Sequence, residues 1–114
     1  MIIQPQDTEL KPCFALFSEG ECESSKLQTM MEKVQEEVDE LRAAIVTYLV
    51  EAPESGTAHG KAREHVLEEG VDAQIALQTL MRVLASTREI EQEVIKDNLK
   101  NGLRGYHGEA PEDD

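Results

Sequence analysis

Two pairs of acidic residues stand where the apolar face of a helix is expected. Glu69 and Asp72 are three residues apart, and so are Glu37 and Glu40. At about 100° per residue, Glu69 and Asp72 fall inside the apolar stripe of their helix, whereas Glu37 falls on its stripe and Glu40 at the edge. The three-residue spacing puts each pair on neighbouring positions of one helix face. Two such helices packed antiparallel would therefore bring four carboxylates together.

Four converging carboxylates need positive charge, because a buried, unpaired carboxylate costs several kcal/mol. His65 is the only basic residue that we place on the two stripes. Ligands that are all oxygen favour hard cations, so the pattern indicates Mg²⁺, with Mn²⁺ as a second choice. A ferritin-like di-iron site needs Glu-x-x-His on two helices, and none of the three His follows a Glu at that spacing. A solvated acidic face is the alternative reading of residues 36–40.

Three helices must position these acids. Apolar residues recur at helical spacing and predict helices over residues 25–50 and 61–85, separated by a loop rich in Pro and Gly. Ser86 followed by Glu89 matches the capping-box pattern and opens a third helix that ends near Gly102. The stripe of the first helix comprises Leu27, Met30, Val34, Val38, Leu41, Ile45 and Tyr48.

The sequence divides into an N-terminal arm without periodicity (1–24), a helical domain (25–107) and an acidic, flexible tail (108–114). No run alternates convincingly enough to predict a strand, so the fold class is all-α. Gly70 in mid-helix costs about 1 kcal/mol relative to Ala, which suggests close approach of another backbone or a ligand. The narrow, Ala-rich stripes predict a bundle completed by oligomerisation, as a homodimer or homotetramer.

Composition excludes several classes of partner. The chain carries 24 acidic residues against 11 Lys and Arg, a net charge of −13, which argues against nucleic acid and anionic membrane surfaces. No apolar run approaches the roughly 20 residues that span a bilayer, and residues 1–6 do not resemble a secretory signal. Cys13 and Cys22 are therefore predicted to be reduced thiols in a cytoplasmic protein.

Three short motifs occur in a fixed order along the chain. Residues 36–40 read E-E-x-x-E, residues 69–72 read E-x-x-D, and residues 100–106 read K-N-x-x-R-G-Y. Together they resemble the MazG-like all-α nucleotide pyrophosphohydrolases, which are related to all-α dUTPases and to phosphoribosyl-ATP pyrophosphohydrolase. The resemblance covers residues 25–107 and leaves the arm outside it.

The resemblance implies a helical bundle completed by dimerisation and an enzyme that cleaves an NTP or dNTP between its α and β phosphates. It assigns Mg²⁺ binding to the four acids, an extra metal-binding or water-orienting role to Glu36, and phosphate binding to basic and amide side chains near the third helix. The implied metal ligands are Glu37, Glu40, Glu69 and Asp72, and the implied substrate-binding residues are Lys100, Asn101 and Arg104. Phosphoribosyl-ATP pyrophosphohydrolase and a non-catalytic helical interaction module stay open as alternatives.

Overall fold

The described residues of this computed structural model, 7–51 and 57–108, form helices and no strand. They comprise a short 3-10 helix, η1, and three α-helices, which confirms the predicted all-α class. The elements are η1 (Phe14–Leu16), α1 (Glu23–Glu51), α2 (Thr57–Leu84) and α3 (Thr87–Leu103). No helix in this part of the chain is both long and apolar enough to cross a membrane.

The predicted helices are correct in number and order, but the second begins too late in the prediction. α2 starts at Thr57 and not at Lys61, so Gly60 lies inside the helix. A methyl group at Gly60 would meet no other atom within 4 Å, and the cost of a helical glycine is only about 1 kcal/mol. A single glycine therefore did not stop this helix. Residues 52–56, which include most of the predicted loop, lie outside the described residues.

The start of α3 agrees with the sequence prediction in detail. The Ser86 hydroxyl accepts a hydrogen bond from the Glu89 N–H at 3.2 Å, and the Glu89 carboxylate accepts one from the Ser86 N–H at 3.0 Å. This reciprocal pair is a capping box, which satisfies donors that the first turn of a helix leaves unpaired. Hydrogen bonds from Ser86 also lower the pKa of Glu89, since they favour its charged form.

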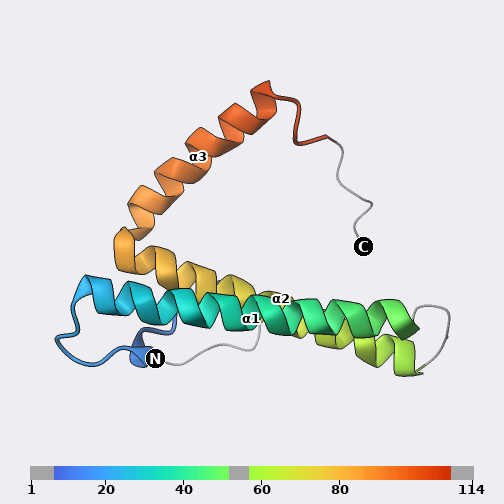
Figure 1. Ribbon diagram of the computed structural model, residues 1–114. Coiled ribbons are helices and arrows are strands. Elements are labelled where there is room, and N and C mark those ends of the chain that lie inside the picture. The colour runs from blue at the N-terminus through green and yellow to red at the C-terminus, as the bar shows by residue number, and fades with distance from the viewer. Residues whose placement is uncertain (1–6, 52–56, 109–114) are drawn as a thin grey trace. The chain divides into compact units, whose positions relative to one another are not determined.

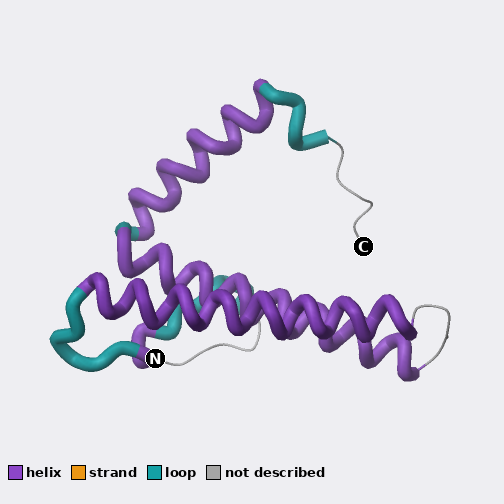
Figure 2. The backbone as a smooth tube through the Cα atoms, in the orientation of Figure 1, coloured by secondary structure: helices purple, strands orange, loops and turns teal. Residues whose placement is uncertain are grey.

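Helices α1 and α2 run antiparallel and pack against each other (Figures 1 and 2). Residues up to Leu84 form one compact unit, and residues from Ala85 onwards, which include α3, form a second. In the first unit, two helices bury only a narrow seam. The buried apolar side chains are Met30, Ala44, Ala62 and Ala76.

The seam is narrower than the predicted stripe. Val38 and Ile45, both placed on the stripe, are 44% and 39% exposed, because one neighbouring helix cannot cover a full apolar face. Gly70 also differs from expectation, since a methyl group there would meet Leu41 Cδ1 at an ordinary 3.9 Å. Within the described residues, packing therefore does not require a glycine at this position.

Many large apolar side chains of the hairpin are left exposed. On α1 and α2 they are Met31, Val38, Ile45, Val46, Leu49, Val50, Leu67, Val71, Leu77 and Leu84. Single exposed apolar residues are normal on protein surfaces, but this number on two helices leaves much of their apolar area in water. The hairpin formed by α1 and α2 therefore has exposed apolar surface that another helix could cover.

Candidate metal centre

The hairpin brings acidic side chains of both helices together near its middle. Glu37 and Glu40 of α1 and Glu69 of α2 each offer a carboxylate oxygen, and these oxygens lie within 4.8 Å of one another. We call these three residues the acid cluster. A second group of the same spread consists of Glu68, Glu69 and Asp72. Asp72 therefore shares a group with Glu69 but not with Glu37 and Glu40. The four predicted ligands do not all offer oxygens within this distance of one another.

Burial differs strongly among these acids. Glu37 is only 7% exposed, and the side chain of Glu69 is 13% exposed. Glu40 and Asp72 are exposed. Asp72 is therefore not buried, although the wheel places it on the apolar stripe, because the seam between two helices is too narrow to cover it. In the acid cluster, Glu37 and Glu69 are therefore shielded from solvent, whereas Glu40 is open to it.

Two oxygens of the acid cluster have no hydrogen-bond partner among the described residues. They are Oε2 of Glu37 and Oε2 of Glu69, and both are fully buried. Buried polar atoms are nearly always paired in folded proteins, and an unpaired charged oxygen is costly. The position of these two atoms therefore favours a positively charged group between the helices.

Lys33, which the sequence analysis missed, supplies part of this positive charge. Lys33 Nζ lies 2.9 Å from Glu37 Oε1, and His65 Nε2 lies 3.1 Å from Glu69 Oε1. Only His65 was expected. On the helical wheel Lys33 lies between Glu37 and Glu40, near the edge of the apolar stripe, and its long stem reaches Glu37 one turn further along the helix. The i,i+4 spacing of Lys33 and Glu37 was the signal that could have revealed it.

Electrostatic coupling across the acid cluster is visible in two pKa shifts. The negative charge of Glu37 is the main cause that raises the pKa of Glu40, followed by desolvation and by Glu69. The hydrogen bond to Glu37 raises the pKa of Lys33. Both shifts have the same origin, since excess negative charge favours protonation of every group around it. A divalent cation would relieve the repulsion among the carboxylates.

Glu36, the implied catalytic residue, lies beside the acid cluster and not within it. It is exposed, and its nearest basic partner is Lys33 at 4.0 Å. Neither group of three acids in the described part of the chain includes it. The Glu36 carboxylate is therefore exposed to solvent, with Lys33 as its ion-pair partner.

Lys100, Asn101 and Arg104 lie together at the end of α3, in the second unit. Their interactions are local. Lys100 Nζ is 3.6 Å from Asp97, the Asn101 carbonyl accepts the Tyr106 N–H at 2.9 Å, and the Arg104 guanidinium lies 5.9 Å from the centre of the Tyr106 ring. Lys100 and Arg104 are four residues apart at the end of α3, so they lie on one side of the helix.

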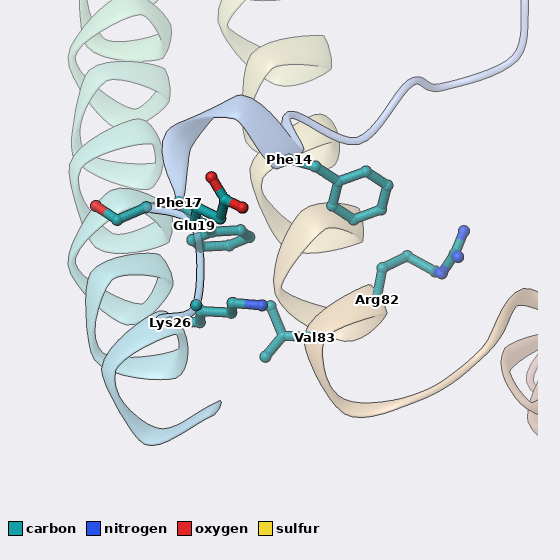
Figure 3. A pocket seen from close by; sticks show the side chains of 8 residues that line it. Phe14, Phe17, Glu19, Lys26, Arg82 and Val83 are labelled. Carbon is teal, nitrogen blue, oxygen red and sulfur yellow. The ribbon is translucent and has the colours of Figure 1, made fainter. Parts of the chain in front are cut away.

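The described part of the N-terminal arm that precedes α1, residues 7–22, packs on the hairpin next to the site. The sequence assigned no role to this segment. On one side the Arg82 Cζ atom lies 5.5 Å from the centre of the Phe14 ring, and Lys26 Nζ lies 5.5 Å from that of Phe17. Figure 3 shows these side chains around the hollow that they line. Each cation–π contact contributes about 0.5–1 kcal/mol at an exposed site.

On its other side the arm is tied to α2 by one long-range hydrogen bond. The Cys13 N–H donates to Thr79 Oγ1 at 3.0 Å. Thr79 is completely buried, and its hydroxyl donates in turn to the Ile75 carbonyl at 2.8 Å. The arm therefore has a defined place on the hairpin, close to the acid cluster.

Comparisons with protein families, with curated proteins and with solved structures find no match to this chain. The functional argument therefore depends on the residues and geometry of the site.

Proposed function

We propose that this protein is a Mg²⁺-dependent nucleoside triphosphate pyrophosphohydrolase, which hydrolyses an NTP or dNTP to the monophosphate and pyrophosphate. The observation that carries the proposal is the acid cluster with its two buried, unpaired oxygens on Glu37 and Glu69. The order of the three motifs along the chain supports the same function.

The donor set fits the proposed metal. All of its ligands are carboxylate oxygens, which Mg²⁺ and Mn²⁺ prefer. Two oxygens that share one Mg²⁺ can be at most about 4.2 Å apart, twice the usual bond length of about 2.1 Å. The acid cluster spreads over no more than 4.8 Å, so small side-chain rotations would suffice. Bound Mg²⁺ would neutralise phosphate oxygens and lower the pKa of a water molecule.

The chain's own residues account for the other parts of the reaction. Glu37, Glu40 and Glu69 would hold the metal, with Asp72 and Glu68 as the adjoining acidic pair. Glu36 would orient the attacking water and accept its proton, because its carboxylate is exposed to solvent. Water attacks the α phosphorus, the bond to the bridging oxygen breaks, and pyrophosphate leaves. Lys100, Asn101 and Arg104 would bind phosphate oxygens.

We propose further that the hairpin self-associates as a homodimer or homotetramer. The exposed apolar side chains of α1 and α2 support this assembly, because two helices alone bury only a narrow seam.

A nucleotide panel with Mg²⁺ tests the proposed reaction. Pyrophosphate release is measured for NTPs, dNTPs and phosphoribosyl-ATP, with wild type and with Glu69→Gln. Glu64→Gln is the matched control, since Glu64 is an exposed acid of α2 outside both acidic groups. The proposal predicts that Glu69→Gln loses at least a hundredfold in rate while folding normally, and that Glu64→Gln does not. Absence of hydrolysis for every nucleotide would favour the interaction module, and phosphoribosyl-ATP as sole substrate would favour the biosynthetic relative.

A further inference from the structure

A hollow of about 290 Å³ adjoins the acid cluster on the side of the arm. Three elements line it, and we call it the arm pocket. Cys13 and Leu16 come from the arm, Lys33 and Glu37 from α1, and Asp72 and Ala76 from α2. Glu37 thus belongs both to the acid cluster and to the wall of the arm pocket.

The lining changes in character along α2. Along α2 the lining residues follow in the order Asp72, Ile75, Ala76 and Thr79. Ala76 is about one turn and Thr79 about two turns beyond Asp72. The charged side chains Lys33, Glu37 and Asp72 therefore adjoin the metal site, whereas Leu16, Ile75 and Ala76 supply apolar surface. A pocket with apolar walls and a few polar groups at one side is typical of small-molecule sites.

The arm wall of the pocket is held in place. The Thr79 hydroxyl is committed to the Ile75 carbonyl as a donor, so its lone pairs face the Cys13 N–H. On the outer side, Phe14 and Phe17 lie against Arg82 and Lys26. Because residues on both sides of Leu16 are anchored in this way, its side chain is held at the pocket.

We infer that the arm pocket takes the nucleoside part, base and sugar, of the triphosphate whose phosphates lie at the acid cluster. The inference rests on the proposed function. A nucleotide bound through its phosphates must place its nucleoside within a few bonds of the metal, and the arm pocket shares Glu37 and Asp72 with the two acidic groups. Its volume of about 290 Å³ is just below the range of about 300–1,000 Å³ for drug-sized ligand sites, which suits a nucleoside. Leu16 and Cys13 of the arm form the wall that contacts it.

The two cysteines provide a direct test with an internal control. Both thiols are free and exposed. Cys13 lines the arm pocket, whereas Cys22 lies outside it, with its Sγ 3.3 Å from the Ser24 hydroxyl. The rate of N-ethylmaleimide alkylation at each thiol is measured by peptide mass spectrometry, with Mg²⁺ alone and with Mg²⁺ plus the α,β-imido analogues of dUTP and the four dNTPs. We expect an analogue that binds to slow alkylation of Cys13 about tenfold or more and to leave Cys22 unchanged.

A substitution in the wall gives a second, kinetic readout. Leu16 is 50% exposed, so Leu16→Ala should fold, and removing its contact should raise KM roughly tenfold with little change in kcat. Leu10→Ala, in the same arm but outside the lining, should leave both constants near those of wild type.

The possible failures are distinguishable. Hydrolysis with wild-type KM in Leu16→Ala, together with an unprotected Cys13 in the presence of a bound analogue, would overturn this inference and leave the proposed function intact. Equal slowing at Cys13 and Cys22 would also overturn it, because it would indicate a global change. Failure of every nucleotide to bind and to be hydrolysed would overturn both proposals.

Discussion

Replacing Thr79 by Val should loosen the arm where it is bonded to α2, at a small cost in stability. The substitution keeps the shape of the buried side chain and removes the acceptor for the Cys13 N–H, which lies 3.0 Å from Oγ1. The Ile75 carbonyl also loses a donor, but it retains its backbone partner within α2. Cys13 is exposed, so water can replace the lost acceptor. We therefore expect the net value of one hydrogen bond, about 1 kcal/mol, and not the larger penalty of a buried unpaired donor.

Thr79→Ser is the matched control, because it keeps the hydroxyl and loses one buried methyl group. That loss also costs about 1 kcal/mol, so both variants should melt roughly 4–8 °C below wild type for a unit of this size. Hydrogen–deuterium exchange then separates them. Amides of residues 13–17 should exchange faster in Thr79→Val and stay as in wild type in Thr79→Ser. Slow exchange in the Val variant, or equally fast exchange in both variants, would refute the role assigned to this hydrogen bond.

Three further predictions concern charge, capping and assembly. Because its folded-state pKa is raised above the ordinary 4.5, Glu40 should make the metal-free protein less stable as pH rises through that pKa. Glu40→Gln should therefore melt above wild type at pH 7, and the difference should shrink as pH falls below 4.5, where the Glu40 carboxyl becomes protonated in both the folded and the unfolded state. Ser86→Ala should destabilise α3 by about 1 kcal/mol through loss of the capping box, seen as lower helicity by circular dichroism; unchanged helicity would contradict it. Sedimentation at micromolar concentration should show a dimer or tetramer, and a strictly monomeric profile would rule out the proposed assembly.

Local signals in the sequence predicted the elements of this fold well. Periodicity located α1 and α2, and the Ser86–Glu89 pattern located the start of α3, because capping and helical spacing depend on residues within one or two turns. The same spacing rule put Glu37 and Glu69 on the apolar faces, and their low exposure confirms that placement. The error at Gly60 arose because one helical glycine costs only about 1 kcal/mol, which is too little to end a helix.

The features of the site that the sequence did not predict depend on tertiary contacts. Thr79 and Cys13 are 66 positions apart, and no local pattern links a helical threonine to an irregular arm. Lys33 lies near the edge of its stripe, between Glu37 and Glu40, but its contact with Glu37 depends on a flexible stem, which a wheel drawn from backbone positions does not show. Asp72 was misplaced because a stripe gives the direction of a side chain but not the width of the seam that covers it.

The central claim is that the carboxylates of Glu37, Glu40 and Glu69 bind a divalent cation between α1 and α2. Titration of the metal-free protein with Mn²⁺, followed by electron paramagnetic resonance of the free ion, measures this binding without any substrate. We predict saturable binding to wild type and to Glu64→Gln, and affinity at least tenfold weaker for Glu69→Gln. Saturable binding of equal strength to all three proteins, or no saturable binding to wild type, would contradict the claim.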